Sequence, residues 1–158
     1  MHVDLVTREQ WKQWNESYTL LPYIRKIQAP VGALLPIVWD RFWEEASSYA
    51  VLLESGKGGR YTMAGLRPAE IITGKGREAR IAAFGGTDRT AERTVQGTPL
   101  ETVRAWMRQW KAPRPEGAPD CCGGAIGYWS YDVARSLEKL PELAVDDLGL
   151  PDYVFQRF

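Results

Sequence analysis

Residues Ala50–Gly65, A-V-L-L-E-S-G-K-G-G-R-Y-T-M-A-G, are the most informative part of this sequence for its fold. It contains two short apolar runs, residues 50–53 and 60–64, separated by a glycine-rich segment at 56–59. A short apolar run bounded by turn residues predicts a buried strand, and glycines between two such runs predict a hairpin. We therefore expect an antiparallel strand pair.

The polar groups at the end of this predicted hairpin suit a small zwitterion. Glu54, Ser55 and the backbone N–H groups of the loop gather there, beside Arg60. A ligand carboxylate pairs with Arg or with backbone N–H groups, and a ligand ammonium group pairs with Glu. The alternative interpretation is an ordinary hairpin with a solvated tip. The glycines match neither of the common nucleotide-binding patterns, GxGxxG and GxxxxGK[ST].

Outside the hairpin, the pattern of apolar and turn residues predicts both helices and strands. Thr98, Pro99 and Glu101 form a T-x-x-E capping box that begins a helix. The predicted helices cover residues 7–14, 34–47, 98–111 and 133–137, and the predicted strands cover 70–76, 79–84, 90–96, 123–128 and 150–158. The predicted fold class is α+β, with antiparallel sheets flanked by helices.

Charge and hydropathy exclude two broad classes of partner. Lys+Arg and Asp+Glu number 20 each, so the chain has zero net charge and lacks the basic surface typical of nucleic-acid-binding proteins. No apolar stretch approaches the length of a membrane-spanning helix, and the N-terminus lacks the pattern of a signal peptide. We expect no nucleic-acid partner, no membrane association and a cytoplasmic location.

The metal-binding residue types are too few or too scattered to form a metal site. Cys121 and Cys122 are adjacent in sequence, and His2 is the single histidine. These residues cannot assemble a zinc site, so we interpret the cysteines as two reduced thiols. The acidic pair Asp146-Asp147 is interpreted as a solvated turn. We therefore expect no metal site in this chain.

Two blocks of sequence together resemble a known family. The first is V-L-L-E-S-x-x-G-G-R-Y-T-x-x-G-L-x-P at 51–68, and the second is G-G-A-I-G-Y-x-S-Y-D-x-A-R-x-L-E at 123–138, followed by L-P-x-L-A-x-D-D-L-x-L-P-D at 140–152. They resemble the N-terminal domain of anthranilate synthase component I and of aminodeoxychorismate (para-aminobenzoate) synthase component I. The resemblance covers 30–158, which leaves 1–29 as an N-terminal extension. The short loop at 56–59 and the segment 128–135 are more similar to the para-aminobenzoate branch.

The resemblance implies a division of labour between this chain and other parts of a larger enzyme. In the family, the catalytic residues and the Mg²⁺ ligands lie in a C-terminal chorismate-binding domain, which these 158 residues do not contain. The implied partners are that domain and a glutamine amidotransferase subunit, which supplies ammonia. The last predicted strand, 150–158, ends without a cap or turn, so we expect the architecture to continue. We expect this chain alone to be inactive and to have no cofactor of its own.

The resemblance also implies a tryptophan-like binding site at the hairpin. Its residues are the L-L-E-S element, Glu54 and Ser55, and the segment that follows, Gly58, Gly59, Arg60 and Tyr61. The complete enzyme would aminate chorismate to 4-amino-4-deoxychorismate for folate biosynthesis. Two alternatives stay open: the regulatory domain of anthranilate synthase component I in tryptophan biosynthesis, and a stand-alone module that binds an amino acid or docks a partner.

Overall fold

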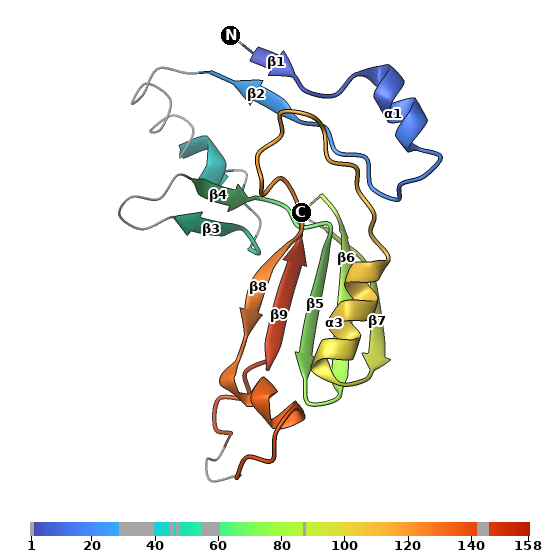
Figure 1. Ribbon diagram of the computed structural model, residues 1–158. Coiled ribbons are helices and arrows are strands. Elements are labelled where there is room, and N and C mark those ends of the chain that lie inside the picture. Colours follow the sequence, from blue (N-terminus) through green and yellow to red (C-terminus); the bar gives the residue numbers. More distant parts are fainter. Residues whose placement is uncertain are drawn as a thin grey trace. The chain divides into compact units, whose positions relative to one another are not determined.

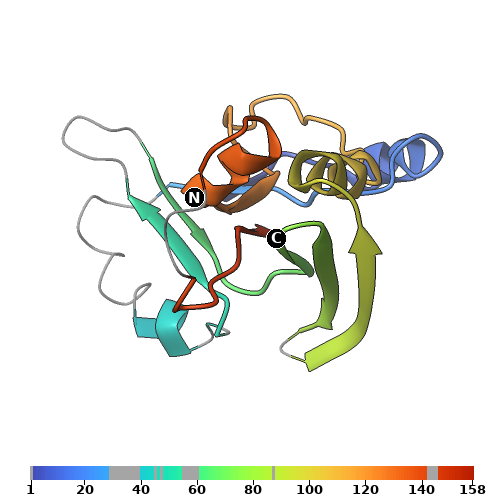
Figure 2. The same cartoon turned by 90° about the horizontal axis from the view of Figure 1, so that it is seen from below.

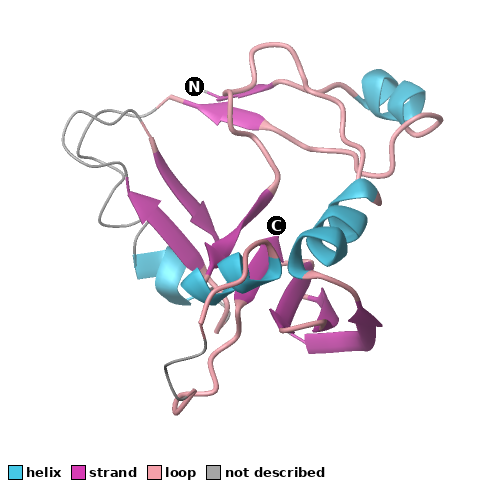
Figure 3. Cartoon of the chain, turned by 60° about the horizontal axis from the view of Figure 1, so that its bottom comes forward, coloured by secondary structure: helices cyan, strands magenta, loops and turns pink. Residues whose placement is uncertain are grey.

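The computed structural model describes residues 2–28, 40–44, 46, 48–54, 61–86, 88–141 and 146–158. The chain forms two compact units, which we describe separately. The first comprises Met1–Glu44 and Ala105–Gly123, and the second comprises Glu45–Arg104 and Gly124–Phe158. Antiparallel strand pairs and short helices occur together, so the predicted α+β class is confirmed (Figure 3). The boundary predicted between residues 29 and 30 lies outside the described residues and stays a prediction.

The first unit begins with a small strand pair and a capped helix. Strand β1 (His2–Asp4) pairs antiparallel with β2 (Arg25–Ile27). Helix α1 (Arg8–Trp14) begins at Thr7, and the Thr7 and Gln10 side chains each accept a hydrogen bond from the other residue's backbone N–H group. These two bonds form a capping box, and the helix predicted over 7–14 is confirmed.

A second helical segment of this unit falls within the predicted helix 34–47. Residues 40–44 are helical. Phe42 is buried and Trp43 is 54% exposed. Residues 34–39, 45 and 47 of that predicted helix lie outside the described residues.

The second unit contains a hairpin and a larger antiparallel sheet. The hairpin joins β3 (Val51–Glu54) to β4 (Thr62–Gly65), as predicted. The larger sheet has the strand order β7-β6-β5-β9-β8 (Figure 1). Its strands are β5 (Glu70–Lys75), β6 (Glu78–Gly85), β7 (Asp88–Gln96), β8 (Ala125–Trp129) and β9 (Tyr153–Arg157). The final strand of the chain therefore lies inside the sheet, between β5 and β8.

One face of this sheet is the apolar core of the second unit. Ile72 of β5 lies opposite both Ile81 of β6 and Phe155 of β9, and Ile72 is fully buried. Helix α3 (Pro99–Arg108) runs along this face (Figures 1 and 2). The Tyr153 side chain hydrogen-bonds to the Thr102 side chain of α3, and burial raises the pKa of the Tyr153 phenol.

Helix α3 begins at the predicted capping box. The backbone N–H of Thr98 donates to Glu101 Oε2 at 3.1 Å, and the Glu101 N–H donates to Thr98 Oγ1 at 3.4 Å. The Thr98 hydroxyl also donates to Glu101 Oε2 at 2.7 Å, and these bonds lower the pKa of Glu101. The Glu101 carboxylate thus satisfies the Thr98 N–H and the Thr98 hydroxyl oxygen satisfies the Glu101 N–H, two donors that would otherwise lack partners at the helix start.

A β-bulge interrupts the pairing of β6 with β7. Ala83 pairs with Ala91 and Phe84 pairs with Arg89, so Thr90 is the extra residue on β7. The Thr90 hydroxyl donates to the Ala83 carbonyl at 3.2 Å. A bulge of this kind shifts the alternation of side chains by one residue.

The last helical element of the second unit is a 3-10 helix. It is η1 (Tyr131–Ser136), where a short helix over 133–137 was predicted. Its Val133 side chain is buried, whereas Tyr131 is 83% exposed. Among the helices that the structure describes, none combines the length and the hydrophobicity needed to cross a membrane.

Candidate functional sites

The structure places two of the six predicted site residues at one end of the β3–β4 hairpin. Glu54 and Thr62 form the last paired position of the two strands, and Tyr61 immediately precedes Thr62. Glu54 is exposed, and Tyr61 is 53% exposed. Both residues are therefore accessible at the same hairpin end. Ser55, Gly58, Gly59 and Arg60 lie outside the described residues, so their roles stay predictions.

The opposite end of the hairpin is anchored by close packing. A Cβ atom built on Gly65 would lie 2.6 Å from the ring of Phe158. The ring can pack this closely because glycine has no side chain. The adjoining segment is held by a hydrogen bond of 2.7 Å from the Ala69 N–H to the Arg157 carbonyl. One hairpin end is thus fixed to the larger sheet, and the polar end carries Glu54 and Tyr61.

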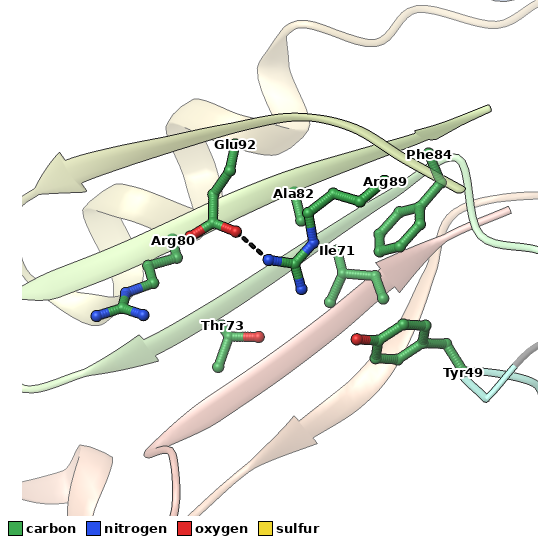
Figure 4. Close-up of a pocket in the computed structure, with 8 residues that line it drawn as sticks. All are labelled: Tyr49, Ile71, Thr73, Arg80, Ala82, Phe84, Arg89 and Glu92. Carbon is green, nitrogen blue, oxygen red and sulfur yellow. Dashed lines mark hydrogen bonds and ion pairs between the residues drawn. The ribbon is translucent and has the colours of Figure 1, made fainter. Parts of the chain in front are cut away.

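A second candidate site is a cavity on the face of the large sheet opposite the core. Its volume is about 190 Å³ (Figure 4). Strands β5, β6 and β7 and the segment that leads into β3 contribute the lining side chains, which are Tyr49, Ile71, Thr73, Arg80, Ala82, Phe84, Arg89 and Glu92. The register explains this grouping, because Ile71 pairs with Ala82 and Thr73 pairs with Arg80, and paired residues share a face.

The cavity combines apolar walls with charged groups. The rings of Tyr49 and Phe84 lie 5.3 Å apart between centroids and are tilted by 59°. Ile71 is 5% exposed. Arg89 forms an ion pair with Glu92, and Arg80 adds a second guanidinium group. The lining therefore carries two positive charges and one negative charge, which favours an anionic ligand.

No local pattern in the sequence predicted this cavity. Its residues come from three strands and a connecting segment, and none of them forms a local motif. Ile71 and Thr73 were predicted to lie in a strand. The pairing of that strand with its neighbours was not predicted. The sequence contained one weak indication of the cavity. Arg80 lies in the predicted strand 79–84, and Arg89 immediately precedes the predicted strand 90–96.

Residues that suggested metal chemistry form no such site in the structure. Among the residues that the structure describes, no three His, Cys, Asp or Glu side chains gather as metal ligands. Asp146 pairs with Lys75 and accepts a hydrogen bond from the Gly149 N–H at 3.0 Å, and both contacts lower its pKa. Cys121 and Cys122 are free and exposed, in agreement with the interpretation as two thiols.

Several curated proteins are similar in sequence to this chain. It is 32% identical over 151 residues to anthranilate synthase component 1 of Cereibacter sphaeroides, covering 93% of this chain and 29% of that protein. It is 36% identical over 135 residues to aminodeoxychorismate synthase component 1 of Bacillus subtilis, covering 82% of this chain and 28% of that protein. Anthranilate synthase component 1 of Acetivibrio thermocellus is 31% identical over 94% of the chain. No family model matches the sequence.

The α+β fold and these relatives define the class of protein as the N-terminal region of a synthase component. The chain belongs to the family that contains anthranilate synthase component 1 and aminodeoxychorismate synthase component 1. It spans less than a third of the length of these relatives and matches their N-terminal part.

Proposed function

We propose that this chain is the N-terminal part of an aminodeoxychorismate synthase component I. In this proposal the complete enzyme uses a C-terminal chorismate-binding domain and ammonia from a glutamine amidotransferase subunit. It converts chorismate to 4-amino-4-deoxychorismate, the precursor of para-aminobenzoate in cytoplasmic folate biosynthesis. The main support is the 36% identity to the Bacillus subtilis aminodeoxychorismate synthase component over 82% of the chain. The short loop at 56–59 favours the same branch.

The proposed role of this chain is binding and structural support, and not the chemical step. The Mg²⁺ ion and the groups that act on chorismate would belong to the C-terminal domain. The hairpin would hold L-tryptophan or a similar amino acid, with Glu54 facing its ammonium group. Ser55, Arg60 and the backbone of Gly58 and Gly59 would face its carboxylate, and Tyr61 would lie against its body. The exposed position of Glu54 and Tyr61 at the hairpin end supports this role.

Anthranilate synthase component I is the second candidate function. It is favoured by the 32% identity to the Cereibacter sphaeroides protein, which covers 93% of the chain. That enzyme would aminate chorismate at C2 and eliminate pyruvate. The two candidates therefore differ in their product. A stand-alone binding module is the third candidate, and it requires no catalytic domain.

Reconstitution in two pieces tests these candidates. We would combine this chain with the part of the Bacillus subtilis relative that lies beyond the matched region, and supply chorismate, ammonia and Mg²⁺. We expect the two polypeptides to associate and to form 4-amino-4-deoxychorismate, detected by mass spectrometry. Because the catalytic part sets the product, the same experiment is repeated with the corresponding part of the Cereibacter sphaeroides relative, and tighter association and a larger rise in activity with that part would favour the second candidate. A folded chain that neither binds the second polypeptide nor raises its activity would contradict both. The second polypeptide alone provides the baseline.

A further inference from the structure

We propose that the cavity between Tyr49 and Arg89 is a second ligand site, which binds a small carboxylate with a flat apolar body. This site is distinct from the hairpin end that carries Glu54 and Tyr61, and it does not depend on the function proposed above. Four features support it: the β-bulge in β7, the available hydrogen-bond donors, the apolar walls and the size of the cavity.

The β-bulge brings Arg89 to the cavity. In a regular strand, residues 89 and 92 would point to opposite faces, because their separation is odd. The extra residue Thr90 shifts the alternation, so that Arg89 and Glu92 lie on one face and form an ion pair. Bulges are common beside functional sites, where they redirect a side chain. The bulge thus places the positively charged Arg89 side chain on the face of the sheet that lines the cavity.

Several donors in the cavity are available to an anion. The ion pair with Glu92 uses Nη1 of Arg89, and a guanidinium group has five N–H donors. The Thr73 hydroxyl also lines the cavity and can donate a hydrogen bond. The ion-pair contact of Arg80 is to Glu78, at 4.0 Å. A ligand carboxylate would accept hydrogen bonds from Arg89 and Thr73 and would neutralise the excess positive charge.

The remaining lining suits an apolar ring. In Figure 4 the Arg89 guanidinium, the Thr73 hydroxyl and the Tyr49 phenol point toward the same space, which Ile71 and Phe84 border. The volume of about 190 Å³ lies below the roughly 300–1,000 Å³ of sites for drug-sized ligands. A single ring with one carboxylate matches both the size and the chemistry. The alternative interpretation is a water-filled cavity that binds no ligand, in which the role of Arg89 is its ion pair with Glu92.

Benzoate is a suitable test ligand. We would titrate it into the ¹⁵N-labelled protein and follow the backbone amides of Thr73 and Arg89 and the Arg89 side-chain Nε–H by NMR. We expect saturable shifts of these signals with benzoate and none with benzylamine, which has a similar ring and the opposite charge. Inorganic phosphate tests whether the site responds to charge alone. Shifts with phosphate equal to those with benzoate would overturn the requirement for an apolar body.

Variants with opposite expected effects separate binding from a structural role. Arg89→Gln should weaken benzoate binding by roughly tenfold or more, because it removes a charged hydrogen-bond donor. Glu92→Gln should strengthen binding, because it frees Arg89 and removes a repulsive charge. Arg104→Gln removes the same charge from an exposed residue of α3 and should leave binding unchanged.

Two results would overturn the proposal. One is a folded wild-type protein whose signals show no saturable shift with benzoate. The other is a Glu92→Gln variant that binds more weakly than wild type while its NMR spectrum shows an intact fold. Neither result depends on which product the reconstituted enzyme forms, so failure of this site and failure of the proposed function are distinguishable.

Discussion

The ring of Tyr153 occupies the space directly above Gly74, so that a Cβ atom on residue 74 would lie 2.1 Å from the ring carbon Cζ. The two residues are paired across β5 and β9. Tyr153 is 1% exposed, and its side chain is hydrogen-bonded to Thr102. The tyrosine therefore has no room to move away, and position 74 accepts glycine alone without rearrangement of the core.

Replacing Gly74 with alanine should destabilise the protein strongly. We expect Gly74→Ala to lower the free energy of unfolding by about 2–3 kcal/mol, because the added methyl group overpacks a filled core. Urea denaturation followed by tryptophan fluorescence measures this loss. Gly123→Ala is the matched control, since a Cβ atom there meets nothing within 4 Å. Equal effects of the two substitutions would contradict the packing argument.

Neutralising Glu70 should also destabilise the larger sheet. Glu70 and Arg157 are cross-strand partners with 3.9 Å between Oε2 and Nη2, and their side chains are 13% and 10% exposed. Burial lowers the pKa of Arg157, and the Glu70 carboxylate opposes that shift. We expect Glu70→Gln to cost about 1–3 kcal/mol, because it removes the charge that compensates a buried guanidinium.

An exposed ion pair provides the control for this prediction. Asp120 accepts a hydrogen bond from Arg114 at 2.6 Å, but the two side chains are 94% and 58% exposed. Asp120→Asn should therefore change the free energy of unfolding by less than about 0.5 kcal/mol. If urea or thermal denaturation shows a larger loss of stability for Asp120→Asn than for Glu70→Gln, burial does not determine how much an ion pair contributes to stability.

The stability of the β1–β2 pair should depend on the ionisation of Asp4. Hydrogen bonds from Arg25 and Tyr23 lower the pKa of Asp4 from 3.8 to about 2. Because the pKa is lower in the folded state, the stabilisation is fully present above pH 4 and is lost as the pH falls toward 2. We expect the difference in unfolding free energy between wild type and Asp4→Asn to be constant above about pH 5 and to shrink below pH 4. An NMR titration of the Asp4 side chain that gives an ordinary pKa near 4 would exclude this coupling.

The proposed tryptophan site predicts a saturable heat of binding. Titration of this chain with L-tryptophan in a calorimeter should give binding that Ser55→Ala and Glu54→Gln both weaken. Ser48→Ala, at an exposed position before β3, should bind as wild type does. Binding that is unaffected by all three substitutions would place the ligand elsewhere. No heat from a folded protein would mean that this chain alone does not hold the amino acid.

Local features of the sequence predicted the elements of this fold well. Apolar runs bounded by glycine and proline correctly predicted β3, β4, β5, β6 and β9, because strand formation and strand ends depend on nearby residues. The capping boxes at Thr7 and Thr98 likewise act within one helical turn. The insertion of β9 between β5 and β8 was not predicted, because it depends on pairing between residues far apart in sequence.

Sequence patterns predicted one of the two candidate sites and not the other, because the residues of only one are consecutive. The hairpin site was found because its residues are consecutive and resemble a family motif. The sheet cavity depends on the register of three strands and on a bulge at Thr90, and threonine is an ordinary strand residue that gives no sign of a bulge. Arg80 and Arg89 line the same cavity only after that register is formed.

The strand order leaves β7 and β8 at the two edges of the larger sheet, and these edges differ in chemistry. Strand β7 carries a bulge and four charged side chains, and both features hinder pairing with the strand of another molecule. Strand β8, Ala-Ile-Gly-Tyr-Trp, has no charge and offers a regular apolar edge. Within the larger sheet, edge-to-edge pairing with another molecule should therefore begin at β8 and not at β7.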